Sequence, residues 1–244
     1  MTMLTIHPAD SAFVAGELMM PLDGTLQTAA DALRWGDYII NSSLVVAFVV
    51  LMMLNLRNFI SIIPALIDSA WRWKGSVNLD SSIKLASARN LTALILTIPC
   101  CLVASRYHLV DVDIFGEMSA TRYTLWSAAL LLTYTLLRHI CFVLTSLRAR
   151  KLELFTAAHH ASYNFFIILS ILLLVEVGIL SVTGVSDANI KIVTTVIAGL
   201  VYLVYLTRKS QIFNSYCSPL TTFLYLCALE FLPTGALIAA IMLL

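Results

Sequence analysis

The chain has 244 residues, of which 60% are hydrophobic and only 12% are charged, with a formal net charge of +1. A soluble domain carries about 25% charged residues, so this composition cannot supply the polar surface of a soluble protein. The near-zero net charge gives no reason to expect binding to nucleic acid. The composition therefore predicts an all-α fold, a polytopic transmembrane helical bundle whose main surrounding is the lipid bilayer.

Residues 1–37 form a polar, acidic leader ahead of the first hydrophobic run. They carry five acidic residues against one side-chain cation, Arg34. The first ten residues have neither the basic region nor the apolar region of a signal peptide, so we expect the first hydrophobic run to stay in the protein. We expect residues 25–35 to form a short helix on the surface.

Six hydrophobic segments follow, and they form a predicted transmembrane domain at 38–244. The predicted spans are residues 38–56, 90–104, 123–147, 163–182, 190–206 and 219–244. Between the first two spans, residues 59–74 place apolar side chains at helical spacing but also contain Pro64 and Asp68. We interpret this segment as an interfacial helix in the headgroup region; a long loop packed on the bundle is the alternative.

The charges of the connecting segments predict an orientation. With the loops assigned alternately to two sides, one side collects four Lys and Arg residues and nine acidic residues. The other side collects ten cations: Arg57, Arg72, Lys74, Lys84, Arg89, Arg148, Arg150, Lys151, Arg208 and Lys209. Because cytoplasmic loops are enriched in Lys and Arg, this second side is predicted to be cytoplasmic and both termini to lie outside.

Three ionisable side chains fall inside the predicted spans: Arg138, Glu176 and Glu230. Charged groups within a membrane are costly, so each is a candidate for function. At 1.5 Å per residue, Arg138 lies roughly 13 Å and Glu230 roughly 15 Å from the cytoplasmic ends of their predicted helices. Glu176 lies roughly 20 Å from the cytoplasmic end of its predicted helix. We therefore predict a buried Glu230–Arg138 pair, although the Arg138 side chain is also long enough to reach toward Glu176. Such a pair can fix the helix register, form part of a substrate or proton path, or hold a partner subunit.

Five further polar candidates lie toward the cytoplasmic side: His139, His159, His160, Tyr163 and Asn164. Tyr163 and Asn164 each follow a histidine by four residues, so each pair shares a helix face and can hydrogen-bond to a neighbouring helix. Two histidines could ligate a b-type haem. Nothing in their spacing, or in that of the five cysteines, requires a metal, so we expect neither a cofactor nor a metal site.

The most distinctive run of the chain is FLYLCALEFLP at residues 223–233. It resembles the C-terminal signature F-L-Y-L-C-x-L-E-I-L-P of the DUF4271 family of uncharacterised Bacteroidetes membrane proteins, with Phe231 where an aliphatic residue is usual. The Tyr163–Asn164 pair also looks similar to that family. The resemblance implies a protein of the bacterial inner (cytoplasmic) membrane, which would place both termini on the periplasmic side. It implies no activity.

The sequence contains no recognisable catalytic motif, and we predict no catalytic residues. Short loops favour a non-enzymatic accessory or assembly subunit that binds a membrane protein partner or a second copy of the chain. The alternative is a small proton- or ion-coupled transporter that uses the intramembrane carboxylates. An intramembrane enzyme also stays open, and a cluster of Arg138, His159 and His160 around a cavity would favour it.

Overall fold

The computed structural model describes residues 13–14, 17–18, 38–72, 75–76, 78–79, 82–109, 120–146, 152–215 and 217–243. Within these residues the fold is helical apart from two short antiparallel strands, β1 (Phe13–Val14) and β2 (Glu17–Leu18). The predicted all-α class is therefore confirmed. The expected helix at 25–35 and the basic cluster at 148–151 lie outside the described residues.

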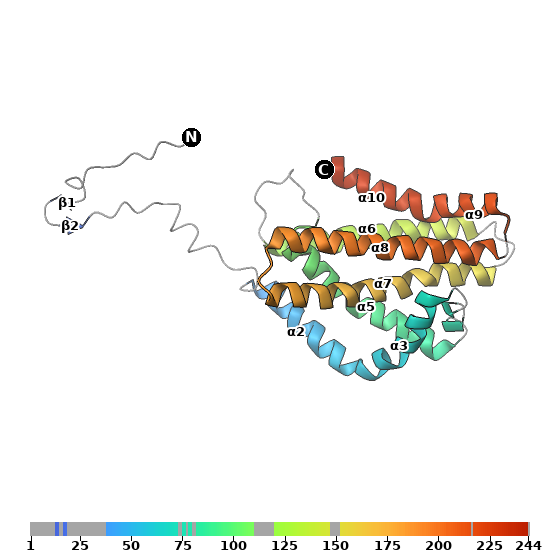
Figure 1. Ribbon diagram of the computed structural model, residues 1–244, viewed down its shortest axis with the longest axis horizontal. Helices are drawn as coiled ribbons and strands as arrows, with labels where there is room; N and C mark the ends of the chain where they lie inside the picture. The colour runs from blue at the N-terminus through green and yellow to red at the C-terminus, as the bar shows by residue number, and fades with distance from the viewer. Residues whose placement is uncertain are drawn as a thin grey trace.

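The long helices α6, α7 and α8 run roughly parallel to one another in a bundle (Figure 1). The bounds are α2 (Ile39–Leu54), α3 (Leu56–Trp71), α5 (Ile83–Arg106), α6 (Ala120–Ser146), α7 (Leu152–Val182), α8 (Asp187–Asn214), α9 (Pro219–Leu226), η4 (Cys227–Phe231) and α10 (Leu232–Leu243). Five described helical segments are long and apolar enough to cross a membrane, or six if the bent pair of α2 and α3 counts as one span. The chain is therefore a polytopic membrane protein, as predicted.

Three helices extend past the predicted spans by about two turns or more, and each of these long extensions is at the side predicted to be cytoplasmic. Helix α5 begins at Ile83 instead of residue 90, α7 begins at Leu152 instead of residue 163, and α8 ends at Asn214 instead of residue 206. Four cations assigned to loops (Lys84, Arg89, Arg208 and Lys209) consequently lie inside α5 and α8, and two of them, Arg89 and Lys209, are buried at 0% and 1% exposure. Of the ten cations counted for the orientation, these two are buried in the bundle instead of lying in a loop.

Helices α2 and α3 meet at Asn55 with a bend of 76° and form the V-shaped lower edge of the molecule in Figure 1. Ile62 and Leu66 of α3 are buried in an apolar cluster that includes residues of α5 and α7. At the end of α3, the Arg208 Nε of α8 donates to the Ala70 carbonyl oxygen at 3.0 Å. Helix α3 thus packs on the bundle, and its depth in the membrane stays a prediction.

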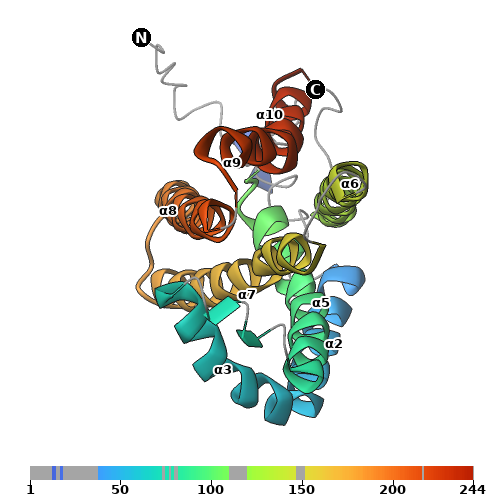
Figure 2. The same cartoon turned by 90° about the vertical axis from the view of Figure 1, so that its right-hand side faces the viewer.

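Helix α7 lies between α5 and α8 in the end-on view of Figure 2 and packs along both. One apolar cluster joins α6, α7, α8 and η4 through Cys141, Phe155, Ala158, Ala161, Ile212, Phe213 and Leu229. A polar cluster ties α6 to α2 and α5, because the Thr124 Oγ1 lies 2.9 Å from Asn41 Oδ1 and 2.8 Å from Ser105 Oγ. In a membrane such interhelical hydrogen bonds contribute about 1 kcal/mol each.

Gly75 packs directly on the backbone at the end of α3. A Cβ atom at this position would lie 2.5 Å from the Asp68 carbonyl carbon and 2.6 Å from the Ser69 nitrogen. We expect Gly75→Ala to lower the free energy of unfolding by about 1–3 kcal/mol, because backbone atoms must shift. Thermal unfolding in mild detergent measures the change. The matched control is Gly178→Ala in α7, where a Cβ atom meets nothing within 4 Å. Equal midpoints for the two variants would contradict the packing described for Gly75.

Candidate functional site

Glu230 lies in η4, a single π-helical turn inside the last membrane-crossing segment. The Leu232 N–H donates to the Cys227 carbonyl, five residues back, instead of four. Pro233 follows and supplies no N–H to the ladder, which is one reason that the regular α-helical pattern breaks here. Single π turns inside α-helices occur often at functional sites. The wide turn directs Glu230 into the bundle, where it is fully buried.

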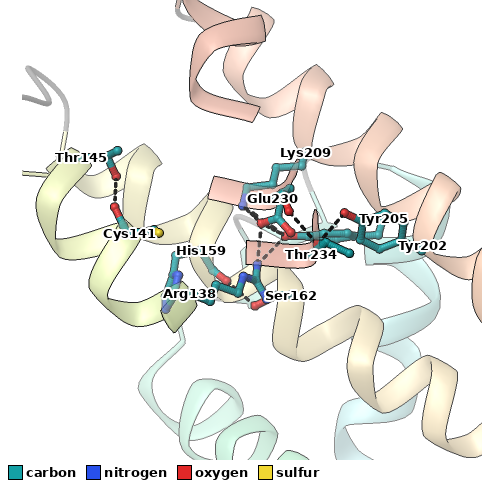
Figure 3. Close-up of polar contacts among 10 residues, drawn as sticks. All are labelled: Arg138, Cys141, Thr145, His159, Ser162, Tyr202, Tyr205, Lys209, Glu230 and Thr234. Atoms are coloured by element: carbon teal, nitrogen blue, oxygen red, sulfur yellow. Dashed lines mark hydrogen bonds and ion pairs between the residues drawn. The ribbon is translucent and has the colours of Figure 1, made fainter. Parts of the chain in front are cut away.

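Three donors from two other helices meet on one oxygen of this carboxylate (Figure 3). Glu230 Oε1 accepts hydrogen bonds from Arg138 Nη2 of α6 at 2.9 Å, from the Tyr205 hydroxyl of α8 at 2.6 Å, and from Lys209 Nζ of α8. The Tyr205 hydroxyl in turn accepts from Lys209 Nζ at 3.1 Å and from Arg138 Nη2. The predicted Glu230–Arg138 pair is confirmed, and it belongs to a four-residue ion cluster of Arg138, Tyr205, Lys209 and Glu230.

The ion cluster contains more positive than negative charge. With all groups ionised, Arg138 and Lys209 supply two cations against the single carboxylate of Glu230. Their side chains are 12%, 1% and 0% exposed, respectively. Neither Glu230 Oε2 nor Arg138 Nε has a hydrogen-bond partner among the described residues. Because unbalanced charge is unfavourable in a low-dielectric interior, one further negative group would be stabilised here.

Arg138 also forms part of the wall of a cavity of about 740 Å³ between α5, α6 and α7. The lining residues are Asn90, Ala93, Leu94, Thr97, Ala128, Leu131, Leu132, Tyr134, Thr135, Arg138, His139, His159, His160, Ser162, Tyr163 and Phe166. Five predicted candidates thus meet on one cavity. Three of them are histidines that lie close together. The ring centroid of His159 lies 6.2 Å from that of His139 and 5.9 Å from that of His160.

Besides Glu230, which lies behind Arg138, two predicted candidates do not line this cavity. Glu176 is half-buried, and its carboxylate accepts a hydrogen bond from the Thr194 hydroxyl of α8 at 3.1 Å. Within the described part of the chain, no hydrogen bond or ion pair joins it to Arg138. Asn164 is fully buried, and its side-chain amide makes no hydrogen bond to the residues that the structure describes. The hydrogen bond that Asn164 could make to a neighbouring helix is therefore not formed with any described residue.

Lys209 and Tyr205 are site residues that the sequence analysis missed. Lys209 was counted as a loop cation because the hydropathy of the fifth span ends near residue 206, whereas α8 continues to Asn214. A usable signal was nevertheless present, since Tyr202, Tyr205 and Lys209 recur at intervals of three and four residues. That spacing places their polar ends on one helix face.

The described residues contain no group of three or more His, Cys, Asp or Glu side chains placed to hold a metal ion. Comparisons with family models, with curated proteins and with solved structures find no match to this chain. The resemblance to the DUF4271 family accordingly stays a prediction.

We expect Glu230→Gln to be the most destabilising single substitution in the ion cluster. It leaves two buried cations without a carboxylate, and an unpaired buried charge costs about 3–5 kcal/mol. Adding Lys209→Met to Glu230→Gln should recover part of this loss, because the double variant removes one charge of each sign. The free energies of unfolding of the wild type, Glu230→Gln, Lys209→Met and the double variant form a double-mutant cycle. Unfolding titrations in mixed micelles, monitored by the helical circular dichroism signal, measure them.

Glu176→Gln is the matched control for this cycle, since it neutralises the other intramembrane carboxylate at a half-exposed position. Its loss should stay within about 1 kcal/mol, the size of one interhelical hydrogen bond in a membrane. A Glu230→Gln/Lys209→Met variant whose loss equals the sum of the two single losses would show that the buried charges are not coupled.

Proposed function

We propose that this membrane protein is a small proton- or ion-coupled transporter whose solute enters the cavity between α5, α6 and α7. The observation that carries the proposal is the double position of Arg138. Its guanidinium pairs with the buried Glu230 carboxylate at 2.9 Å, and its side chain also lines the cavity. We further propose, from the charge bias and the family resemblance, the bacterial inner membrane with periplasmic termini.

The double position of Arg138 links the cavity to the buried carboxylate. A solute that binds the guanidinium competes with Glu230 for it, while Lys209 and Tyr205 continue to donate to the carboxylate. Solute binding therefore changes the charge balance around Glu230, and by thermodynamic linkage a proton or cation bound at Glu230 changes solute affinity. Such reciprocal coupling between two adjacent sites is what an ion-coupled transporter requires.

The geometry favours solute movement over catalysis at this cavity. Arg138, His159 and His160 do lie around one cavity, the arrangement that an intramembrane enzyme would need. However, the Ser162 hydroxyl donates to the His159 carbonyl oxygen at 2.6 Å instead of to an imidazole. A serine nucleophile is activated by hydrogen bonding to a neighbouring base, and Ser162 is not arranged in this way.

We expect pH jumps to produce transient currents that depend on Glu230. The wild-type protein, reconstituted in liposomes on a solid-supported membrane, should give such a current, because proton binding at an intramembrane carboxylate moves charge within the membrane field. The Glu230→Gln/Lys209→Met variant keeps the net charge of the ion cluster and should lose most of the current.

Glu176→Gln serves as the control for the current measurement and should retain the wild-type amplitude. Helical circular dichroism of each reconstituted variant verifies that it is folded. Wild-type proteoliposomes that respond like protein-free liposomes would contradict the transport proposal. A folded Glu230→Gln/Lys209→Met variant with full current would contradict the role of Glu230.

A second candidate function is the accessory or assembly subunit that the short loops favour. The observation in its favour is Glu176, a half-exposed carboxylate within an apolar membrane-crossing helix, bonded to the Thr194 hydroxyl. A carboxylate at such a position is costly in contact with lipid and would be stabilised by a polar group of a partner helix.

Purification through an N-terminal tag in mild detergent tests this second function. An accessory subunit should co-purify with a partner, or with a second copy of itself, in fixed stoichiometry. Glu176→Gln should lose that partner, whereas Glu230→Gln/Lys209→Met should keep it, since Glu230 is fully buried. A single monomeric species from native membranes would argue against an obligate subunit.

A further inference from the structure

The cavity between α5, α6 and α7 has the size and the lining of a small-molecule site. Its volume of about 740 Å³ lies within the range of roughly 300–1,000 Å³ that is usual for such sites. The lining residues of α6 extend from Ala128 to His139, which at 1.5 Å per residue gives a length of roughly 16 Å along that helix. An elongated occupant would therefore fit this cavity along the helix axis.

The two ends of the cavity differ in polarity. Along α6 the lining changes from Ala128, Leu131 and Leu132 to Arg138 and His139. Along the antiparallel α7 the order is reversed, with His159 and His160 preceding Phe166, so the cationic and imidazole groups share one end and the apolar groups share the other. An occupant that fits both ends has one polar and one apolar end.

The charge at the polar end has one sign. The lining includes Arg138 and three histidines, and none of the lining residues is Asp or Glu. The ion cluster behind Arg138 has two cations and one carboxylate, and Arg138 Nε has no hydrogen-bond partner among the described residues. When an anion pairs with Arg138, the Lys209–Glu230 pair remains and the whole cluster becomes neutral. The polar end is therefore suited to a group with one negative charge.

The apolar end opens to the outside of the bundle. Leu94 and Leu132 line the cavity and are 69% and 70% exposed. In a membrane-spanning bundle, apolar side chains exposed at this level face lipid, so the cavity is accessible sideways from the bilayer. This favours an occupant that is already dissolved in the membrane over a water-soluble anion.

We propose that the cavity binds a single-chain anionic amphiphile, with its acidic headgroup on Arg138 and its acyl chain against the apolar residues of α5, α6 and α7. The inference rests on the proposed function, because it names the substrate class for the same site. The histidines of α6 and α7 surround the headgroup, and the exposed leucines form the entrance from the bilayer.

Native mass spectrometry of the full-length protein, released from detergent micelles, tests the proposal with dodecanoate, dodecyl phosphate, dodecanol and acetate as probes. We expect one dodecanoate or dodecyl phosphate per chain and at least about tenfold weaker binding of neutral dodecanol, since a desolvated charge pair is lost. Acetate, which lacks the chain, should not compete. Equal binding of dodecanol and dodecanoate, or full competition by acetate, would overturn the proposal.

Two matched pairs of variants locate the binding. Ala128→Trp places a bulky ring in the apolar end of the cavity, away from the ion cluster, and should abolish dodecanoate binding. Ala129→Trp should not, because Ala129 does not line the cavity. Arg138→Gln should weaken binding at least about tenfold, and Arg106→Gln, at an exposed surface ion pair, should leave it unchanged. Unchanged binding by a folded Ala128→Trp protein would show that the amphiphile does not occupy this cavity.

The outcomes also separate this inference from the transport proposal. If pH jumps produce Glu230-dependent currents in a protein that binds no amphiphile, the transport proposal is supported and the proposed substrate class is wrong. Cavity-dependent binding of dodecanoate without such currents would support the binding site and remove the transport function.

Discussion

The bundle depends on one buried carboxylate held between two cations. Glu230 is fully buried, and a charge in that position is tolerated only when partners are supplied from neighbouring helices. Arg138 on α6 and Lys209 on α8 supply them, and Tyr205 donates to the same oxygen. Three separate helical segments must therefore meet at one depth, which fixes their relative register.

Helix α6 is attached to the rest of the bundle by polar contacts at two levels. Near its start, Thr124 contacts Asn41 and Ser105, and further along Arg138 pairs with Glu230. Between these two levels the side chains of α6 line the cavity instead of packing tightly on α7. The polar contacts at these two levels hold α6 in place without tight packing between them. The cavity can therefore exist beside α6 although the helix is fixed in the bundle.

Much of this arrangement could be predicted from the sequence. Composition and hydropathy predict the class and the membrane-crossing segments, and a depth argument at 1.5 Å per residue pairs Arg138 with Glu230. Hydropathy could not place Lys209 inside a helix. The mean hydropathy decreases at charged residues, whereas the helix α8 continues to Asn214. Pro233 predicts a break in the backbone hydrogen bonds of the helix, but it does not distinguish a kink from a π-helical turn. The cavity depends on side-chain packing between three helices, which no local pattern encodes.

The order of the charges along the chain has a consequence for biogenesis. The cations Arg138 and Lys209 are synthesised before Glu230, which belongs to the last membrane-crossing segment. During insertion α6 therefore enters the bilayer with an uncompensated Arg138, and a charge at a helix centre costs about 2.5–3.5 kcal/mol; Lys209 lies closer to the end of α8. Both cations obtain a carboxylate partner only when the segment with Glu230 packs beside them. Assembly of α6 and α8 is thus coupled to the arrival of the segment that carries Glu230, because the two cations have no carboxylate partner before it joins them.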